Sequence, residues 1–236
     1  MNKKISKRLS ACLDALSSLS KCADIGCDHA YLPCYGISEG IIDSAIAIDV
    51  IDGPLDQARR TIADYGLTDK IELRKGSGLE PLSIGEVEGV SIAGMGGKLI
   101  SQLLEDNLPI AKSMEILVFQ PQGGESILRR TLYENDFSIT NEQLLEEDAI
   151  IYTIITAVPE GCATKPSENI KFTELDIIFG PILRQYVKDE LFIKKWSQEV
   201  AAIDKILIKI PEGNKRKKEF EQKKQLIKDV LAGVTS

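Results

Sequence analysis

The stretch KCADIGCDHAYLP, residues 21–33, holds the densest group of chemically active residues in the chain. An apolar run ends at Gly26, and Asp28 and His29, the only histidine of the sequence, follow it. A glycine at the end of a buried strand is typical of nucleotide-binding turns, where a ligand approaches the backbone closely. The turn is therefore expected to hold a ligand, and its acidic residue restricts which one.

The charge of this turn disfavours a pyrophosphate. A dinucleotide-binding turn follows G-x-G-x-x-G, but Asp28 occupies the second glycine position, where a carboxylate would repel phosphate. S-adenosyl-L-methionine has no phosphate and carries a sulfonium and an ammonium group. The spacing Asp24-x-Gly26-x-Asp28 keeps that of the methyltransferase loop D/E-x-G-x-G-x-G. We therefore predict that this turn binds S-adenosyl-L-methionine through Asp24, Gly26, Cys27, Asp28 and His29.

Two other predicted strand ends carry candidate site residues. SAIAIDV ends with Asp49 and Val50, and an acidic residue there can bind the ribose hydroxyls, although capping of the next turn explains it equally well. AGMGGKL, residues 93–99, has three glycines in four positions, which a close approach to the backbone explains better than a tight turn does. We expect Ala93, Gly94 and Met95 beside the cofactor and Gly96 and Gly97 beside the substrate.

The segment FQPQGG, residues 119–124, adds carboxamides at the same sheet edge. Gln120 and Gln122 can hydrogen-bond the edge of a base, and Pro121 ends the strand between them. Tyr31 or Phe119 can stack on a base, but Phe119 is expected in the core because it lies within a strand. Tyr31, Gln120, Pro121 and Gln122 are therefore candidate substrate contacts.

Alternating apolar and amphipathic runs must position these residues. Strands are expected at 21–26, 44–50, 70–75, 89–94, 114–120, 137–145 and 149–158. Helices are expected at 31–39, 54–66, 97–107 and 124–135. The βαβα rhythm predicts an α/β, Rossmann-like sheet that is mostly parallel, with the last two strands as an antiparallel edge pair. This layout fits a class I methyltransferase better than a dinucleotide-binding protein.

A linker rich in Pro, Gly, Ser and Asn, residues 159–170, divides the chain into expected domains 1–160 and 161–236. Apolar residues at helical spacing over 171–208, broken at Gly180-Pro181, precede the turn 210–214 and a helix at 215–232. They predict a C-terminal helical hairpin resembling a coiled coil.

Composition is that of a globular protein, with 43% hydrophobic and 28% charged residues. No apolar run reaches the ~20 residues of a membrane span, so we expect a cytoplasmic protein without membrane contact. The five cysteines have no C-x-x-C spacing, so we expect buried reduced thiols and no metal site. Residues 161–236 carry 15 Lys+Arg and 11 Asp+Glu against 14 and 25 in the remainder, a basic tail on an acidic body.

The chain resembles the bacterial tRNA (adenine-22-N1)-methyltransferases. The resemblance rests on SKRLSACLDAL, ADIGCDHAYLP, AIAIDV, GPLDQA, KIELRKGSGL, SIAGMGGKLI, LVFQPQGGESILRR and EEDAIIYTI, which occur in the family's order between about residues 5 and 158. The combination of DHAYLP with GMGG is specific. The resemblance implies a class I methyltransferase domain, S-adenosyl-L-methionine as donor with S-adenosyl-L-homocysteine as product, tRNA as substrate and a helical C-terminal domain.

Two departures from the family affect expected contacts. Gly76-Ser77-Gly78 stands where the family commonly has Gly-Asp-Gly beside the cofactor adenine. Ser77 and Gly78 are still expected to contact the cofactor, although serine offers a hydrogen bond without charge. Gln120-Pro121-Gln122 replaces the family's Gln-Pro-Asn and keeps the carboxamide.

The resemblance implies a methyl transfer that needs positioning rather than a strong base. N1 of adenine has an in-plane lone pair and attacks the sulfonium methyl without losing a proton first. Asp28 and His29, with Gly94 and Met95, are the candidate catalytic residues. Asp28 or His29 either orients the methionine part of the cofactor or accepts a hydrogen bond from the exocyclic amine of adenine, and a purely local role for His29 is equally compatible with the sequence.

Two basic segments are candidate tRNA contacts. One is formed by Lys3, Lys4, Lys7 and Arg8 on a predicted first helix, and the other by Lys215, Arg216, Lys217 and Lys218. Solvated helix faces explain such runs as well. Three alternatives stay open: a methyltransferase with another substrate, an RNA-binding scaffold that has lost catalysis, and an NAD-dependent oxidoreductase, which Asp28 disfavours. No obligate protein partner is implied.

Overall fold

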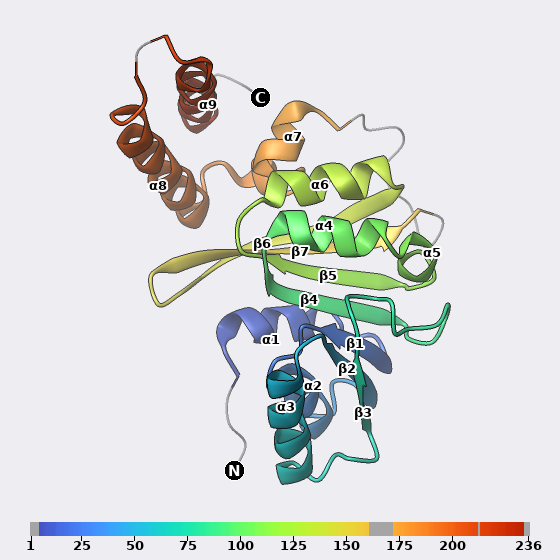
Figure 1. The fold of residues 1–236 in the computed structure, drawn as a ribbon. Coiled ribbons are helices and arrows are strands. Elements are labelled where there is room, and N and C mark those ends of the chain that lie inside the picture. The colour runs from blue at the N-terminus through green and yellow to red at the C-terminus, as the bar shows by residue number, and fades with distance from the viewer. Residues whose placement is uncertain (1–4, 161–171, 212, 234–236) are drawn as a thin grey trace. The chain divides into compact units, whose positions relative to one another are not determined.

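The computed structural model describes residues 5–160, 172–211 and 213–233. The chain divides into two compact units, Met1–Pro181 and Ile182–Ser236. The first unit holds the β-sheet and the helices that cover it, and the second is helical (Figure 1).

The first unit contains a seven-stranded sheet with the order β3-β2-β1-β4-β5-β7-β6 (Figure 1). Its strands are β1 (Lys21–Ile25), β2 (Ser44–Asp49), β3 (Ile71–Lys75), β4 (Gly89–Met95), β5 (Ile116–Pro121), β6 (Phe137–Glu147) and β7 (Ile150–Pro159). Strands β1 to β5 are parallel, whereas β7 is antiparallel to both β5 and β6. The predicted mostly parallel sheet with an antiparallel edge pair is confirmed.

Helices cover both faces of this sheet. They are α1 (Lys7–Asp14), α2 (Tyr31–Ser38), α3 (Asp52–Asp64), α4 (Gly97–Glu105), α5 (Leu108–Ala111), α6 (Glu125–Glu134) and α7 (Glu174–Phe179). Helices α1, α2 and α3 lie on one face, and α4 and α6 lie on the other (Figure 1). The parallel strands therefore enter the core with both of their faces covered.

Alternate residues of one strand enter different cores. In β2, Ile46 and Ile48 join the core beneath α4 and α6, while Ala45 and Ala47 join the core beneath α1, α2 and α3. All four side chains are at most 3% exposed. Burial of a large aliphatic side chain contributes about 1.5–3 kcal/mol, so this double packing holds the carboxyl ends of the central strands in fixed positions.

The second unit consists of the 3-10 turn η1 (Leu183–Tyr186), α8 (Glu190–Leu207) and α9 (Lys215–Leu231). The two long helices begin at side-chain caps, since Asp189 accepts from the N–H groups of Leu191 and Phe192 and Asn214 accepts from that of Arg216. The buried apolar side chains of these helices are Phe192, Trp196, Ile203, Ile227 and Val230. The predicted C-terminal helical part is present.

The division between the units falls after Pro181, whereas the sequence placed the domain boundary at residue 160. The predicted linker lies largely in 161–171, outside the described residues. Helix α7 belongs to the sheet unit because Nη1 of Arg129, on α6, donates to the carbonyls of Ile177 and Ile178 at 3.2 and 3.0 Å. Arg129 also forms an ion pair with Glu142 of β6 at 2.7 Å, and both side chains are at most 1% exposed.

Candidate active site

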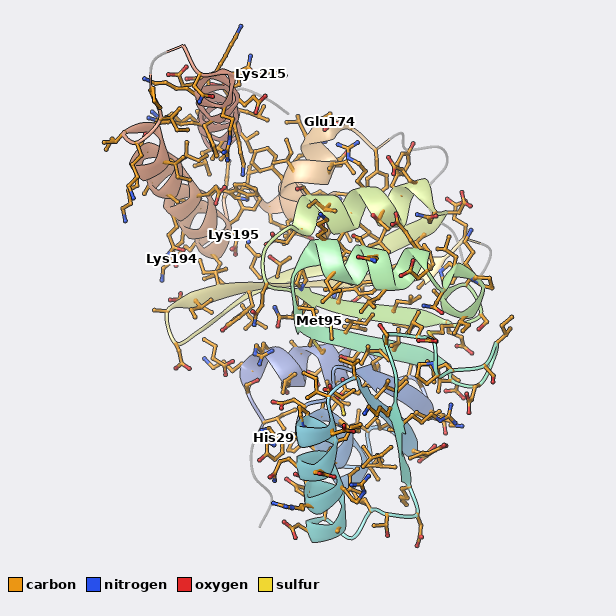
Figure 2. The ribbon with its side chains drawn as sticks, in the orientation of Figure 1. His29, Met95, Glu174, Lys194, Lys195 and Lys215 are labelled. Carbon is orange, nitrogen blue, oxygen red and sulfur yellow. The ribbon has the colours of Figure 1, made fainter. Side chains whose placement is uncertain are left out.

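A cavity of about 490 Å³ lies at the carboxyl ends of β1, β2 and β4. Fifteen predicted site residues line it: Arg8, Asp24, Gly26, Cys27, Asp28, His29, Tyr31, Asp49, Val50, Ser77, Gly78, Ala93, Gly94, Met95 and Gln122. His29 and Met95 are labelled in Figure 2. Parallel strands bring together segments that are up to about a hundred residues apart in the sequence, as expected for ligand sites in open α/β sheets.

The remaining predicted site residues of the sheet unit do not line this cavity. They are Lys7, Gly96, Gly97, Gln120 and Pro121. Lys7 is exposed, and its backbone N–H donates to Glu147 at 2.7 Å. Gln120 and Pro121 are buried within β5. The predicted basic run Lys215, Arg216, Lys217 and Lys218 starts α9 in the second unit, and Lys3 and Lys4 lie outside the described residues.

Two aspartates that line the cavity, Asp24 and Asp49, are nearly buried. Asp49 accepts hydrogen bonds from the backbone N–H groups of Ile51 at 3.0 Å and of Asp28 at 3.3 Å, which ties the first turn to the end of β2. Burial, and to a lesser extent the charge of Asp49, raises the pKa of Asp24 to about 7. A buried carboxyl of this kind favours a cationic ligand, which would compensate its charge.

The turn after β1 needs unusual backbone conformations. Gly26, Asp28 and Ala30 have φ values of 67°, 48° and 54°. The φ of Gly26 favours glycine at this position, and a Cβ there would also displace the flexible end of the Met95 side chain. The left-handed conformation at Asp28 and Ala30 costs free energy and directs the turn into the cavity.

Asp28 and His29 form a loosely paired edge of the cavity. Nε2 of His29 lies 3.5 Å from Oδ1 of Asp28, and their side chains are 41% and 69% exposed. The ring of His29 lies 5.4 Å from that of Tyr31. Nδ1 of His29 is buried without a hydrogen-bond partner among the described residues. A purely local role would satisfy this nitrogen, so its orphaned state favours a ligand contact over the local role.

The glycines of AGMGG have three different roles. Gly94 has φ 79° and lies where the β4–β5 register shifts, so it forms a bulge that opens the end of β4 into the cavity. A Cβ on Gly97 would collide with the carbonyl of Gly124, and the N–H of Gly97 donates to Gly123 at 2.8 Å. Gly97 thus permits α4 to approach the turn before α6. It does not line the cavity, and its contact with the substrate stays a prediction. Gly96 has open space around it but does not line the cavity.

Gln120 has an internal role instead of the predicted contact with a base. Its side chain is fully buried, and its Oε1 accepts from the N–H of Gly94 at 3.2 Å and from Nη1 of Arg8 at 3.0 Å. Its Nε2 donates to the carbonyl of Pro121 at 3.0 Å. The sequence placed Gln120 correctly at the strand end, but its side chain points into the sheet unit. Gln122 does line the cavity and keeps the predicted carboxamide there. Phe119 is buried in the core, as predicted.

Several residues that line the cavity were not predicted from the sequence. They are Leu9, Ile25, Leu32, Ile51, Gly76, Leu99 and Leu103. Ile51 and Leu99 are 59% and 48% exposed, so they present apolar surface at the cavity. Ile51 follows Asp49 by two positions and Leu99 lies in the first turn of α4, so a search of the residues just after each strand end would have found both.

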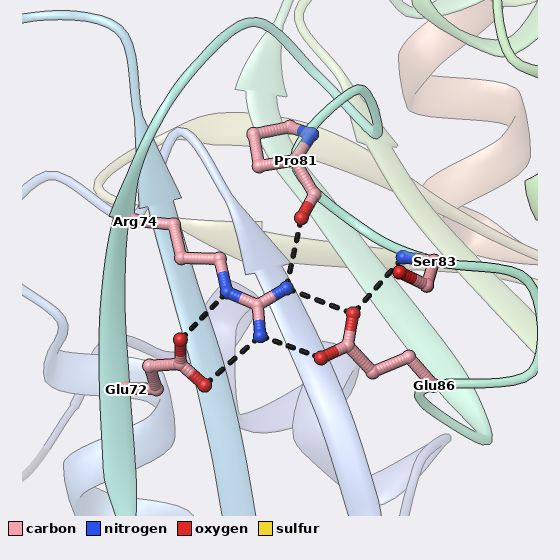
Figure 3. A network of polar contacts seen from close by, with 5 residues as sticks. All are labelled: Glu72, Arg74, Pro81, Ser83 and Glu86. Atoms are coloured by element: carbon pink, nitrogen blue, oxygen red, sulfur yellow. Dashed lines mark hydrogen bonds and ion pairs between the residues drawn. The ribbon is translucent and has the colours of Figure 1, made fainter.

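The loop that carries Ser77 is anchored by Arg74 of β3 (Figure 3). The Arg74 guanidinium donates to the carbonyl of Pro81 and to Glu86, each at 2.8 Å, and it also binds Glu72 at 2.9 Å. The hydrogen bonds that Glu86 accepts from Arg74 and from the N–H of Ser83 lower the pKa of Glu86 to about 2. The network fixes the segment that returns from the cavity toward β4.

Other features restrict the chemistry of the site. In the described part of the chain, no group of three or more His, Cys, Asp or Glu side chains is arranged to hold a metal ion, and no helix is long and apolar enough to cross a membrane. Burial raises the pKa of the Cys27 thiol, which lines the cavity, so this cysteine is not a ready nucleophile.

Two features define a class I methyltransferase. One is the seven-stranded sheet with its antiparallel β7, and the other is a cavity at the strand ends that is lined by acidic residues. The family described as tRNA (adenine(22)-N(1))-methyltransferase matches residues 22–232. The chain is 35% identical over 234 residues to the Bacillus subtilis tRNA (adenine(22)-N(1))-methyltransferase, covering 97% of each chain. This protein belongs to the tRNA (adenine(22)-N(1))-methyltransferase family.

Two solved structures resemble the chain along almost its whole length. Streptococcus pneumoniae Sp1610, crystallised in complex with S-adenosyl-L-methionine, is 34% identical with a TM-score of 0.85, covering 97% of this chain and 100% of that one. M. capricolum TrmK, in complex with S-adenosyl-homocysteine, is 26% identical with a TM-score of 0.84, covering 98% of this chain and 99% of that one. The similarity therefore includes the C-terminal helical unit as well as the sheet unit.

Proposed function

We propose that this protein transfers the methyl group of S-adenosyl-L-methionine to N1 of adenine 22 in tRNA. The observation that carries this proposal is the cavity at the ends of β1, β2 and β4 in a chain of this family. Asp24, Asp28 and Asp49 line this cavity together with the bulge at Gly94. The product would be S-adenosyl-L-homocysteine. The complexes of the two relatives with these molecules support the same donor and product.

The residues present fit S-adenosyl-L-methionine. The molecule supplies an electrophilic methyl group on a sulfonium cation when it is bound. The nearly buried carboxyl of Asp24 and the more exposed one of Asp28 suit the cationic groups, and Asp49 keeps acceptor capacity for ribose hydroxyls beyond its two backbone partners. Val50, Ser77 and Gly78 are further candidate contacts on the walls of the cavity.

The chain's own residues would act on the acceptor base by orienting it. The in-plane lone pair of adenine N1 attacks without a base, so catalysis depends on position and on the exclusion of water. The bulge at Gly94 and Met95 leaves space at the end of β4, Gln122 offers a carboxamide to the base edge, and Tyr31 offers a ring for stacking. Asp28 or His29 would either hold the methionine part of the donor or accept from the exocyclic amine, and the exposed Asp28 suits both roles.

The C-terminal helical unit is proposed to contact tRNA. The first turn of α9 contains Lys215, whose side chain is 92% exposed, followed by Arg216, Lys217 and Lys218. Such a basic run binds a folded RNA through its phosphates. The protein is proposed to act in the cytoplasm, where unmodified tRNA is available, with S-adenosyl-L-methionine and tRNA as its partners.

The decisive experiment is transfer of labelled methyl from S-adenosyl-L-methionine to unmodified tRNA transcripts. We expect 1-methyladenosine in a transcript with adenine 22 and none when guanine replaces it. Tight binding of S-adenosyl-L-methionine by calorimetry without any transfer would favour the RNA-binding scaffold, and transfer to the guanine-22 transcript would indicate another substrate.

A further inference from the structure

Arg8 differs from every other residue of the cavity in charge. The described lining contains three aspartates, and Arg8 is its one arginine or lysine. The sequence grouped Arg8 with neighbouring lysines as part of an exposed basic helix face. The structure instead turns this side chain inward, since it is partly buried and lines the cavity, while Lys7 is exposed.

Two contacts hold the guanidinium of Arg8 in place. Nη1 donates to Oε1 of Gln120 at 3.0 Å, and Cζ lies 5.8 Å from the centroid of the Tyr152 ring on β7. Gln120 is fully buried and is itself fixed by the N–H of Gly94. These partners are neutral, so they orient the guanidinium without neutralising its charge.

The guanidinium also lies close to the bulge at the end of β4. A Cβ built on Gly94 would be 3.6 Å from Nη1 of Arg8 and 3.9 Å from Nε2 of Gln122. Nη1 of Arg8 binds Gln120. Because a guanidinium has five N–H donors in a planar fork, this bond leaves donors that can bind a ligand. Such a fork binds carboxylate or phosphate oxygens in pairs.

We propose that Arg8 binds an anionic group of a ligand in this cavity and that Gln120 is the positioning residue that aims it. Two sources provide such a group: the carboxylate of the methionine part of S-adenosyl-L-methionine, and a backbone phosphate beside the target adenine. The inference rests on the proposed function for the identity of these ligands. It assigns Arg8 to the cavity rather than to the outer tRNA-binding surface.

The test compares ligands that differ only in the anion. Binding of S-adenosyl-L-methionine and of its decarboxylated analogue would be measured by calorimetry on the full chain, for wild type, Arg8→Gln and Arg8→Lys. Arg59→Gln, at an exposed arginine of α3, is the matched control, and thermal melting checks the fold of each variant. Affinity for an adenine-22 transcript would be measured by fluorescence anisotropy at several salt concentrations.

Either source gives a distinct result. If Arg8 binds the carboxylate, Arg8→Gln weakens S-adenosyl-L-methionine at least tenfold and the decarboxylated analogue less than twofold, with partial recovery in Arg8→Lys. If Arg8 binds a phosphate, both small ligands keep their affinity and tRNA binding weakens severalfold. The dependence of log affinity on log salt concentration should then also become shallower by the amount that about one phosphate contact contributes. Gln120→Met should reproduce the same pattern, and adding Arg8→Gln to it should add little.

Two results would overturn the assignment. One is wild-type affinity of Arg8→Gln for all three ligands, and the other is equal weakening of S-adenosyl-L-methionine and its analogue, which indicates a purely structural role. Both readouts measure binding alone. If wild type fails to methylate the adenine-22 transcript while Arg8→Gln still weakens S-adenosyl-L-methionine much more than its decarboxylated analogue, the proposed function fails and the assignment of Arg8 stands.

Discussion

The two adjacent glycines at the start of α4 provide a stringent test of how α4 packs against the turn before α6. Gly97 has its missing Cβ directed at the backbone of Gly124, whereas Gly96 has no atom within 4 Å of that position. We predict that Gly97→Ala destabilises the protein and that Gly96→Ala does not. The two changes are identical in chemistry and neighbours in sequence, so the difference between them isolates the close approach of α4 to the turn before α6.

The magnitude follows from three contributions. Forcing a methyl group against backbone, which cannot rotate away, costs about 1–3 kcal/mol. Weakening the 2.8 Å hydrogen bond from the N–H of Gly97 to Gly123 costs about 1 kcal/mol more. Alanine recovers about 0.5–1 kcal/mol through its helix propensity. The net loss is roughly 2 kcal/mol, which lowers the Tm of a chain of this length by about 4–8 °C.

Thermal melting and urea unfolding of the three proteins would measure this loss. Gly96 has φ −66°, a conformation that alanine also adopts. In Gly96→Ala, the loss of a favoured helix-cap residue and the gain from a less flexible unfolded chain nearly cancel. Its Tm should therefore stay within about 2 °C of wild type. Equal melting temperatures for the two variants would refute the reasoning, because they would show that α4 can shift away from Gly124 at no cost.

Three further predictions concern charged groups. Burial and the charge of Asp49 raise the pKa of Asp24 to about 7, so the folded chain binds this proton more tightly than the unfolded chain does. As the pH rises from about 4 to 7, the free energy of unfolding in urea should therefore fall relative to that of Asp24→Asn, by about 1.4 kcal/mol per pKa unit. A difference between the two proteins that stays constant with pH would contradict this. Arg129→Met removes the guanidinium that forms an ion pair with the buried carboxylate of Glu142 and should cost about 3–5 kcal/mol in urea unfolding. Much of this loss should be regained when Glu142→Leu is added; no recovery would count against the buried pair as the cause. Arg74→Gln removes the hydrogen bond to the Pro81 carbonyl that anchors the loop of Ser77, and Ser77 lines the cavity. Steady-state kinetics should show a KM for S-adenosyl-L-methionine that is severalfold higher, with little change in kcat. An unchanged KM would mean that the loop holds its position without Arg74.

The positions of the strands followed from the sequence to within about one or two residues at each end. β2, for example, reads SAIAID, a run of apolar residues in which both faces must be covered, and it ends at Asp49, one residue before the predicted end at Val50. A continuous apolar run between helical segments indicates a parallel strand, and parallel strands place their carboxyl ends at one edge. These local patterns were sufficient to bring Asp24, Asp49, Ser77 and Gly94 to one cavity, as the structure shows.

The sequence could not determine which way individual side chains point at those ends. Gln120 and Gln122 are separated by one residue, and period-two alternation only indicates that both lie on the same side of a regular strand. β5 ends at Pro121, so Gln120 remains in the regular strand and turns to Gly94 and Arg8, while Gln122 leaves the strand and reaches the cavity. The end of a strand is set by hydrogen bonds to its neighbours, which are not encoded locally.

The sequence by itself determined the sheet, its antiparallel edge pair, the acidic turn after β1 and the family to which the chain belongs, because each depends on residue order within a short segment. Only the tertiary structure decided the roles of Gly97 and Arg8. Gly97 is required by a backbone that approaches from residues 123 and 124, and Arg8 is turned inward by Gln120, 112 positions away. Contacts over such distances depend on how the helices pack across the sheet, so the same basic segment that suggested a surface for RNA instead supplied the cavity with its arginine.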